Sequence, residues 1–465
     1  MDTEKLKQKI LDLAIRGKLV PQDPNDESAE ELIKRIQEEK AKLVKEGKIK
    51  ASKEESVIFK GSDNCYYEKM GSQTNNITDE IPFEIPSNWF WCRLKHIGEI
   101  VGGGTPSTAV KEYWFNGSIV WITPKNMSKL KTNYIIDSDR KITLKGLQNS
   151  STKLMPPDSI IMSSRAPIGY IAINKVPACT SQGCKSVVPY LSNMSEFLLY
   201  IIKSSINRII SASSGTTFDE ISGTEFSNIL IPLAPINEQI RIVKQIDETL
   251  KLLRNISEEY KSIQELVTVT KSKILDSFFS ENSSYKSYYP ITKGILSNFC
   301  DKITKGTTPT SYGFKYQSSG IPFVKVENVD NFKINLNTIN CYISEETHEF
   351  QKRSQLKEDD ILFSIAGTIG KLCLVRKENT PANTNQAFAI ISGYNKYIAP
   401  KYLLYYLEWT KHSNSKVDSH GLGMNNATLT GLKNLEIWFP QEISNQQKIV
   451  YEIENILSKL KQIIS

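Results

Sequence analysis

The sequence predicts an α+β protein in which two similar mixed α/β domains are separated by an antiparallel pair of long, coiled-coil-like helices. The chain contains an internal repeat, which indicates two copies of the same fold. An ordered series of short matches at a nearly constant offset relates residues from about Trp91 to Leu250 to residues from about Ile295 to Leu457. In addition, apolar residues recur at heptad-like spacing from Asn237 to about Phe279 and again at the C-terminal end, as is typical of helices that pair along a seam.

Four pairs of short segments carry the repeat, in the same order and at similar spacing. They are GGGTPS (Gly102 to Ser107) with KGTTPT (Lys305 to Thr310), IVWITPKN (Ile119 to Asn126) with IPFVKVEN (Ile321 to Asn328), DSIIMSSRAPIG (Asp158 to Gly169) with DDILFSIAGTIG (Asp359 to Gly370), and CTSQ (Cys179 to Gln182) with NTNQ (Asn383 to Gln386).

The helical part of the repeat is divided between the two ends of the chain. The first copy continues into KSKILDSFF (Lys271 to Phe279), whereas the second copy stops at Ser465 in mid-pattern. KQKILDLAI (Lys7 to Ile15) matches the missing stretch. We therefore expect a cyclic arrangement with a pseudo-twofold axis between the domains, and duplex DNA is the commonest twofold target.

The N-terminal region predicts two helices followed by a linker. Ser28 and Glu31 form a capping box that opens the second helix, which continues to about Glu46. Residues 48–79 are polar without sustained periodicity and predict a linker. The first helix has a coiled-coil spacing at Leu6, Ile10, Leu13 and Gly17.

Each globular copy is predicted to contain many short strands. Runs such as SIVWIT, SIIMSS and GYIAI are bounded by Gly, Pro and Asn, as is typical of strands. Ser195 to Ala212 and Pro400 to Thr410 are expected to be helices. The central helix, of about 43 residues, would span roughly 65 Å and act as a spacer. The predicted seam positions are Val243, Ile246, Leu250, Leu253, Tyr260 and Val267, and then Ile449, Ile453, Ile456, Leu460 and Ile463.

These elements give six segments. They are N-terminal helices at 1–50, a polar linker at 51–80, the first domain at 81–236, the central helix at 237–282, the second domain at 283–442 and the C-terminal helix at 443–465.

The composition is that of an ordinary globular protein. A net charge of +7 permits phosphate contacts without requiring them. The seven cysteines are scattered and lack CxxC pairing, which argues against a disulfide framework or a zinc ribbon. The charged N-terminus has no apolar segment of a signal peptide, and no run is long enough for a membrane span. We expect a soluble cytoplasmic protein with no membrane partner.

No catalytic signature is found. GTIGK (Gly367 to Lys371) resembles the end of a phosphate loop, but Ile365 stands where the first glycine is required. MPPD (Met155 to Asp158) predicts a turn, because it lacks the flanking polar and aromatic residues of an amino-methyltransferase loop. The histidines, none at metal-ligand spacing, are His96, His348, His412 and His420. The sequence therefore predicts a binding protein without catalytic residues, metal or cofactor.

The candidate DNA-binding residues are polar and basic side chains in loops after strands, at equivalent points of both copies. In the first copy they are Thr123, Lys125, Asn126, Ser163, Ser164, Arg165, Gln182 and Lys185. In the second copy they are Lys325, Glu327, Asn328, Ser364, Asn385 and Gln386. Arg, Lys, Asn and Gln suit the edges of bases, and Ser and Thr suit phosphates. For each residue the alternative is a capped turn or a solvent-facing side chain.

Comparison of the copies separates two kinds of candidate. Asn126 matches Asn328 and Gln182 matches Gln386, which favours a shared structural role. Arg165 in the first copy corresponds to Ala366 in the second copy, and positions that differ in this way are better candidates for base contacts. The two half-sites should therefore differ.

Several long segments resemble the specificity subunit of type I restriction-modification systems, and the resemblance covers nearly the whole chain apart from the linker. The segments are SSRAPIGYIAI (Ser163 to Ile173), GTTFDEISGTEFSNILIPLAPINEQIRIV (Gly215 to Val243), LDLAIRGKLVPQDPND (Leu11 to Asp26) and IPFEIPSNWFWCRL (Ile81 to Leu94). The second copy departs from this pattern at SIAGTIGKL (Ser364 to Leu372) and HGLGMNNATLTGL (His420 to Leu432).

The resemblance implies two target recognition domains, each recognising one half of a bipartite asymmetric DNA site. Because both domains must face the same duplex, the half-site centres should lie about one helical turn, roughly 10 bp, apart. It also implies docking of two methyltransferase subunits, which methylate adenine N6, and of restriction and translocase subunits. S-adenosylmethionine, ATP and Mg²⁺ are then expected in the partner subunits and not in this chain. The alternative is a non-catalytic two-domain scaffold that binds protein partners through its coiled coil. A self-contained nuclease or methyltransferase would require motifs that are absent.

Overall fold

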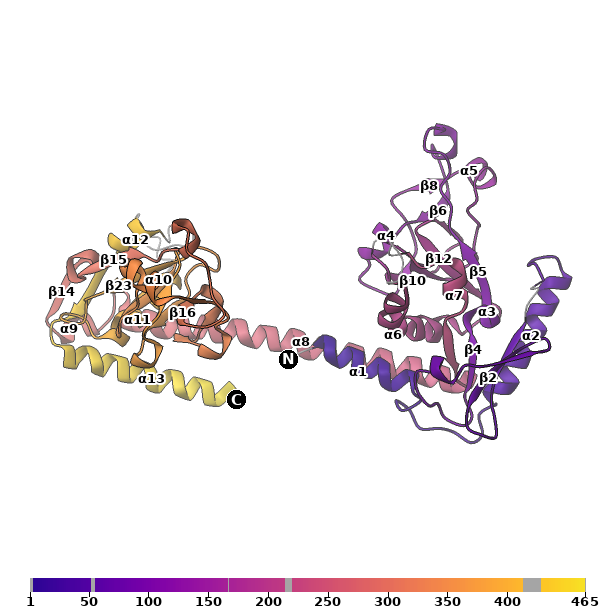
Figure 1. The fold of residues 1–465 in the computed structure, drawn as a ribbon, viewed down its shortest axis with the longest axis horizontal. Helices are drawn as coiled ribbons and strands as arrows, with labels where there is room; N and C mark the ends of the chain where they lie inside the picture. The colour runs from indigo at the N-terminus through magenta and orange to yellow at the C-terminus, as the bar shows by residue number, and fades with distance from the viewer. Residues whose placement is uncertain (1–2, 52–54, 166, 214–219, 413–427, 465) are drawn as a thin grey trace. The chain divides into compact units, whose positions relative to one another are not determined.

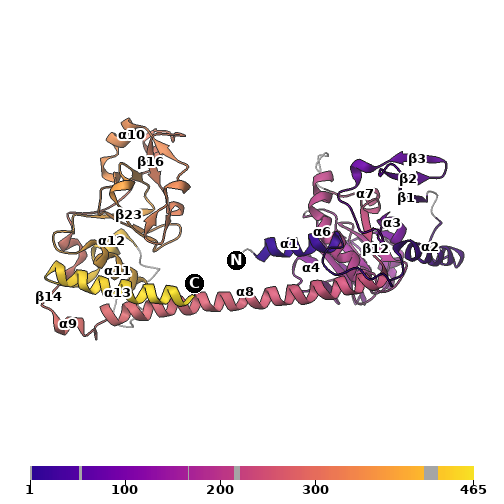
Figure 2. The same cartoon turned by 90° about the horizontal axis from the view of Figure 1, so that it is seen from below.

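The computed structural model describes residues 3–51, 55–165, 167–213, 220–412 and 428–464. The chain divides into two compact units, unit 1 (Met1–Glu258) and unit 2 (Glu259–Ser465). Each unit is a mixed α/β body in which helices pack beside short sheets (Figures 1 and 2). The predicted α+β class with two similar domains is confirmed.

Helices flank the sheets in both units. In unit 1 they are α1 (Thr3–Ile15), α2 (Ala29–Lys45), α3 (Leu94–Ile97), α4 (Pro124–Ser128), α5 (Leu144–Gln148), α6 (Ser195–Ser213) and α7 (Gly223–Ser227). In unit 2 they are α9 (Tyr285–Tyr288), α10 (Glu345–Phe350), α11 (Pro400–His412), α12 (Leu429–Lys433) and α13 (Ile443–Ile464). The expected long helix is α8 (Ile236–Phe279), whose first part belongs to unit 1 and whose last part belongs to unit 2.

The described strands of unit 1 form sheets with the orders β1-β2-β3, β5-β12-β9-β10-β7, β11-β6-β8 and β13-β4. Their bounds are β1 (Ser56–Lys60), β2 (Tyr66–Met70), β3 (Gln73–Asn76), β4 (Phe90–Arg93), β5 (Gly98–Gly102), β6 (Ile119–Ile122), β7 (Tyr134–Ile135), β8 (Lys141–Ile142), β9 (Ile160–Ser163), β10 (Ile171–Asn174), β11 (Ala178–Thr180), β12 (Cys184–Pro189) and β13 (Leu230–Leu233).

The described strands of unit 2 form sheets with the orders β14-β24, β15-β23-β20-β21, β19-β16-β22 and β17-β18. Their bounds are β14 (Ile291–Ile295), β15 (Lys302–Lys305), β16 (Ile321–Val324), β17 (Val329–Asp330), β18 (Lys333–Ile334), β19 (Tyr342–Ile343), β20 (Ile361–Ser364), β21 (Leu372–Leu374), β22 (Asn383–Thr384), β23 (Phe388–Ser392) and β24 (Glu436–Pro440).

The two units share the central part of their topology. β6 runs parallel to β11 as β16 runs parallel to β22. β12 lies between β5 and β9 as β23 lies between β15 and β20. Asp158 and Asp359, just before β9 and β20, both adopt a left-handed backbone with φ of 65° and 68°, which is uncommon for residues other than glycine. The turn predicted at Met155 to Asp158 is therefore present and has a counterpart in unit 2.

Each unit closes its main core with the same pair of helical segments. In unit 1 the buried residues of this pair are Leu11, Ala14 and Ile15 from α1 and Ile242 and Ile246 from α8. In unit 2 they are Leu275, Phe278 and Phe279 from α8 and Ile449 and Ile453 from α13. Thus α1 takes in unit 1 the place that the end of α8 takes in unit 2, as the match between their sequences predicts.

The helical seams differ from the predicted ones. Leu6 is 44% exposed, and the buried face of α1 is formed by Leu11, Ala14 and Ile15 instead. The predicted spacing assumes one partner helix, whereas α1 packs into the core of a globular unit that also contains α6. Tyr260 and Ile456, also predicted at seams, are exposed.

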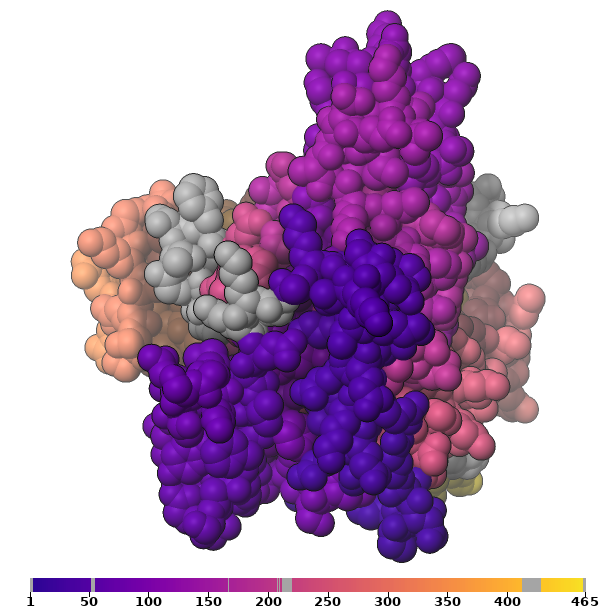
Figure 3. Space-filling view, turned by 90° about the vertical axis from the view of Figure 1, so that its right-hand side faces the viewer, coloured from indigo at the N-terminus to yellow at the C-terminus, as the bar shows by residue number. Residues whose placement is uncertain are grey.

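Residues 51–80, predicted as a polar linker, contain a three-stranded antiparallel sheet instead. In this sheet β1 pairs with β2 and β2 pairs with β3. Ile58 and Tyr66 are buried against Trp91, which attaches the sheet to unit 1. The prediction was wrong because the strands are short and mostly polar, so too few apolar residues mark their buried face. Figure 3 shows the N-terminal residues, coloured indigo to violet, covering one side of unit 1.

The predicted capping box of the second helix is confirmed, because Ser28 Oγ accepts from Glu31 N and Glu31 accepts from Ser28 N. His420 and residues 215–219 and 420–427 of the quoted segments lie outside the described residues, as does the side chain of His412. Within the described ranges, no helix combines the length and the apolar character that a membrane crossing needs.

Candidate nucleic-acid interface

The candidate residues of unit 1 gather where three strands end. Thr123 follows β6, Arg165 follows β9 and Gln182 follows β11. Backbone hydrogen bonds join these ends, since Ser164 N donates to Gly183 O at 2.9 Å and Ser181 N donates to Ile122 O at 2.9 Å. We call this edge the rim of unit 1 and define it as residues 123–126, 163–165 and 181–185.

Several rim side chains stabilise local turns. Thr123 caps α4, because its Oγ1 accepts from Asn126 N at 3.4 Å and donates to Asn126 Oδ1 at 2.7 Å. Ser163 Oγ donates to Pro167 O at 2.8 Å and accepts from Tyr170 N at 2.9 Å. These bonds correspond to the alternative interpretation of capped turns. Ser164 Oγ is buried and has no hydrogen-bond partner among the described residues.

Arg165 and Lys185 meet at a carboxylate that the sequence analysis did not single out. Arg165 Nη1 lies 3.8 Å from Glu220 Oε2, and Lys185 Nζ lies 3.6 Å from Glu220 Oε1. Lys125 and Gln182 are exposed on the same rim. Glu220 was missed because the contact joins residues far apart in the chain, and nothing in its sequence neighbourhood marks it.

The rim of unit 1 contains one thiol, and it is not a nucleophile. Burial raises the pKa of Cys184 to about 12, even though Arg165 and Lys185 act in the opposite direction. A thiol with such a pKa stays protonated at neutral pH, and the thiolate is the reactive form. The rim can therefore bind, through its cations and amides, but it offers no cysteine chemistry.

Unit 2 repeats the rim on equivalent strand ends. Lys325 follows β16, Ser364 ends β20 and Asn385 follows β22. Ile365 N donates to Ala387 O at 2.7 Å, which corresponds to the bond from Ser164 N to Gly183 O in unit 1. We define the rim of unit 2 as residues 325–328, 364–366 and 385–387.

Two rim residues of unit 2 have the same local roles as their counterparts. Asn328 Oδ1 accepts from Lys325 N at 2.8 Å, as Asn126 Oδ1 accepts from Thr123 N at 3.0 Å. Ser364 Oγ donates to Thr368 O at 2.6 Å, as Ser163 Oγ donates to Pro167 O at 2.8 Å. The matching residues thus cap the same turns in both units.

The other rim residues of unit 2 differ in chemistry from those of unit 1. Gln386 is exposed, and its Oε1 accepts from Thr308 Oγ1. Asn385 Oδ1 accepts from Ala387 N at 3.1 Å in a local turn. Lys325 Nζ lies 5.4 Å from the ring centre of Tyr316, and Glu327 is exposed. Ala366 places a methyl group where unit 1 has a guanidinium.

In both units a glycine lets a neighbouring segment lie directly on the rim. A Cβ on Gly103 would be 1.8 Å from Ser181 O, and a Cβ on Gly306 would be 2.2 Å from Asn385 O. Both distances are far shorter than any non-bonded contact allows. The chain after β5 and after β15 therefore forms a fixed side wall of each rim.

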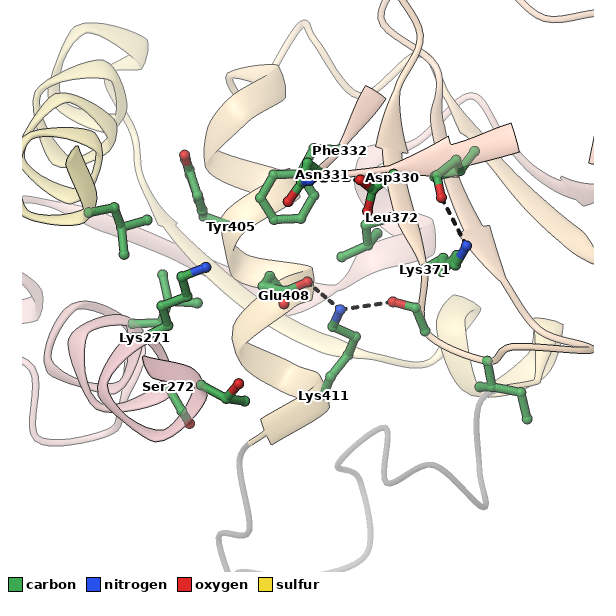
Figure 4. A pocket seen from close by; sticks show the side chains of 16 residues that line it. Lys271, Ser272, Asp330, Asn331, Phe332, Lys371, Leu372, Tyr405, Glu408 and Lys411 are labelled. Atoms are coloured by element: carbon green, nitrogen blue, oxygen red, sulfur yellow. Dashed lines mark hydrogen bonds and ion pairs between the residues drawn. The ribbon is translucent and has the colours of Figure 1, made fainter. Parts of the chain in front are cut away.

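A separate cavity of about 420 Å³ lies in unit 2, between α8, α11, α13 and the turn after β17 (Figure 4). Lys411 pairs with Glu408 and donates to Gly370 O at 2.8 Å. The ring of Phe332 stands edge-on to Tyr405, with 5.8 Å between centres. No residue of the unit 2 rim lines this cavity, so it is distinct from the candidate interface.

The rim thus occurs twice, on equivalent strand ends, and comparison with known families gives the same duplication. Residues 86–268 and residues 291–464 match the family model of the type I restriction modification DNA specificity domain. The chain belongs to this family. The resemblance to type I specificity subunits inferred from the sequence is therefore confirmed.

Two curated relatives are similar over about half of the chain. The type I restriction enzyme MjaIX specificity subunit of Methanocaldococcus jannaschii is 31% identical over 256 residues, which cover 53% of this chain and 59% of that protein. The type I restriction enzyme EcoAI specificity subunit of Escherichia coli is 34% identical over 258 residues, which cover 53% of this chain and 39% of that protein. The matched regions are thus less than two thirds of the length of these relatives.

A solved structure has a similar fold. It is described as the structural basis of complex assembly and conformational transition of the type I R-M system, and one of its chains matches with a TM-score of 0.59. The identity is 20%, and the match covers 82% of this chain and 94% of that chain. At this identity the likeness shows the fold of a specificity-domain protein, and the roles of individual side chains have to be argued from the rims themselves.

Proposed function

We propose that this chain is the DNA-binding specificity subunit of a type I restriction-modification complex and that it recognises a bipartite, asymmetric DNA site. The observation that carries the proposal is the rim that is built twice on the same strand ends with different exposed side chains. Fixed strand ends position the side chains, and only side chains that reach base edges discriminate between sequences. Two rims of one geometry and two chemistries therefore suit two unlike half-sites.

The charges on the rims support contact with a phosphate backbone. Lys125, Arg165 and Lys185 lie on the rim of unit 1, and the last two share the carboxylate of Glu220. Lys325 occupies the rim of unit 2. Cations that neutralise phosphates release counterions from DNA, which makes the affinity steeply dependent on salt.

The proposal gives the chain no catalytic step. Methylation of adenine N6 and DNA cleavage belong to two methyltransferase subunits and to restriction and translocase subunits, which bind S-adenosylmethionine, ATP and Mg²⁺. Apolar side chains on α8 support a protein-binding surface, because Leu252 is 58% and Leu266 is 66% exposed. Since the proposed target is cellular DNA, we expect the assembled complex in the cytoplasm.

Methylome sequencing of cells with and without this chain tests the proposal. We expect one bipartite adenine-methylated motif to disappear when the gene is deleted and to return when it is restored. An unchanged methylome in cells that express all partner subunits would contradict the proposal.

A gel shift with random duplex separates the proposal from the alternative of a protein-binding scaffold. A DNA-binding chain should lose affinity steeply as salt rises, because phosphate contacts displace counterions. A scaffold that binds only proteins through α8 should give no shift at any salt concentration.

A further inference from the structure

Arg165 follows a rim residue whose backbone is hydrogen-bonded to two other segments. The preceding residue, Ser164, donates its N–H to Gly183 O and accepts from Ile221 N, both at 2.9 Å. The turn that follows is closed by Ser163 Oγ. A backbone fixed on both sides presents its side chain at little entropic cost on binding.

The side chain of Arg165 is positioned but not saturated. Glu220 Oε2 lies 3.8 Å from Nη1, a distance that gives an ion pair but not a hydrogen bond. Within the described ranges the guanidinium has no closer partner, so its fork of N–H donors remains available. Both side chains are about two-fifths exposed, at 41% and 38%, so little free energy is lost when DNA replaces this pair.

The same carboxylate also holds Lys185, whose side chain is only 15% exposed. Gly183 lies between Arg165 and the start of α4, since a Cβ there would be 3.4 Å from both Arg165 Nε and Pro124 Cγ. The guanidinium therefore lies beside Gly183 and Glu220. Unit 2 has Ala366 at the equivalent strand end and offers no such group.

We propose that Arg165, positioned by Glu220, recognises a guanine in the half-site bound by unit 1. This inference rests on the proposed function and deepens it. A guanidinium can donate two parallel hydrogen bonds to guanine O6 and N7 in the major groove, and no other base presents two acceptors there. Glu220 is a positioning residue, because it acts on DNA only through Arg165 and Lys185. Unit 2, which has Ala366 at this point, recognises its half-site without this contact.

The test is selection of bound sequences from a library of random duplexes by the full chain and its variants. The wild type should select a bipartite motif with a fixed guanine in one half. R165A should lose the preference at that one guanine by roughly ten- to a hundredfold, as expected for one bidentate contact. The other half of the motif should stay unchanged. R165K should keep most of the affinity and lose most of the guanine preference, since ammonium cannot form the fork.

Glu220 is tested by E220Q, which keeps the shape of the side chain and removes its charge. Preference for the guanine should fall severalfold, whereas affinity for random duplex should be unchanged or higher because one negative charge is gone. A merely structural role would lower both. The matched control is E99Q, which breaks the ion pair of Glu99 with Lys153, 2.6 Å apart, at the opposite end of β5. It should leave both quantities unchanged.

A modified base gives a second readout. Replacing the guanine by 7-deazaguanine removes the N7 acceptor, and it should weaken binding of the wild type but not of R165A. The inference is overturned if R165A selects the wild-type motif, or if the lost position is not a guanine. If the wild type itself selects no motif, the proposed function fails as well, so the two failures are distinguishable.

Discussion

Unit 1 and unit 2 build the same strand ends, the same caps and the same helical pair from sequences that differ in most exposed side chains. What they share are backbone hydrogen bonds and the side chains that cap them, such as Asn126 and Asn328. Among the at least partly exposed residues that they do not share are Arg165 of unit 1 and Ala366 of unit 2. The scaffold therefore depends on a few capping and core residues, and the rim side chains that make no cap can differ between the units.

The two units also differ in the residues at the position of Asn133 in unit 1. In unit 1, Asn133 Nδ2 donates to Tyr200 OH at 3.2 Å, and Ile206 lies against Gly169. In unit 2, Phe332 takes the place of Asn133, because its carbonyl accepts from Leu374 N as Asn133 O accepts from Ile173 N. Phe332 and Tyr405 both line the cavity of unit 2.

The largest difference is the N-terminal addition of unit 1. Helix α2 and the β1-β2-β3 sheet lie between α1 and β4, whereas in unit 2 only a short segment joins α8 to β14. The sheet is attached by the ion pair of Arg93 Nη2 with Glu68 Oε2, 2.7 Å apart, whose side chains are only 10% and 9% exposed. Arg93 Nη2 also lies 2.8 Å from Glu80 Oε2. The position of Arg93 is taken by Ile295 in unit 2, because both precede a leucine that donates to the paired strand.

The largest difference in stability between the two units is expected when the guanidinium of Arg93 is removed. R93A should destabilise unit 1 by about 3–5 kcal/mol, since the carboxylate of Glu68 is left buried without its partner. I295A should destabilise unit 2 by only about 1–2 kcal/mol, because its side chain is half-buried and carries no charge. Hydrogen exchange of peptides from each unit measures both effects. Removing both charges with R93M and E68Q together should recover part of the loss, and equal effects in the two units would contradict the expectation.

A second difference should appear with pH, because unit 1 has His96 where unit 2 has Asn298. Burial lowers the pKa of His96 from 6.5 to about 4. The unfolded chain takes up a proton near the higher value and the folded unit only near the lower one. The resulting stability is present above pH 6.5 and is lost as pH falls towards 4, by roughly 3 kcal/mol.

The measurement is the free energy of unfolding of unit 1 in denaturant at several pH values, monitored by hydrogen exchange of its peptides. H96N introduces the unit 2 residue and should remove this part of the pH dependence. Ser56 Oγ, 3.2 Å from His96 Nε2 and 2.6 Å from Glu68 Oε1, links the ring to the carboxylate. If H96N keeps the wild-type pH profile, the titrating group is another one.

Substitution of the equivalent rim glycines should destabilise the two units to a similar extent. G103A and G306A each force a Cβ into a backbone carbonyl, so each should destabilise its own rim by about 1–3 kcal/mol. Hydrogen exchange at residues 181–185 and 385–387 reports the local effect. G102A is the control, because a Cβ there meets nothing within 4 Å. A clearly larger effect in one unit would mean that the two rims are not built in the same way.

The capping amides should show the smallest effects. N126A should destabilise unit 1 by about 1 kcal/mol, as is usual for a lost cap. N328A should cost about 2 kcal/mol, since Asn328 is only 2% exposed and also donates to Thr338 O at 2.8 Å. The difference in unfolding free energy between the two variants is the quantity to measure. A smaller loss for N328A than for N126A would contradict this ranking.

The fold could be predicted largely from the sequence because its signals are local or repeated. Heptad-like spacing predicts α8, and the capping box of Ser28 and Glu31 predicts the start of α2. The matched segments predict that β6, β9 and β11 have counterparts in unit 2. The candidate rim residues do come together, since residues that follow the ends of neighbouring strands must meet at one edge.

Other features depend on contacts between residues far apart in the chain, and no local pattern records them. The sheet of β1, β2 and β3 is held by Ile58, Tyr66 and Glu68 against β4, so its short polar strands resemble a linker when taken alone. The buried face of α1 is set by the core that it enters and not by its own periodicity. Glu220 contacts the rim only because the segment before α7 places it near both Arg165 and Lys185.

The sequence by itself therefore determined the duplication, the helices and the approximate location of the rims, because hydrogen-bonded turns and apolar periodicity are encoded within a few residues. The tertiary structure decided which rim side chains are engaged in caps and which remain exposed. That division depends on distances between separate segments, and these exist only once the strands are aligned and the cores are packed.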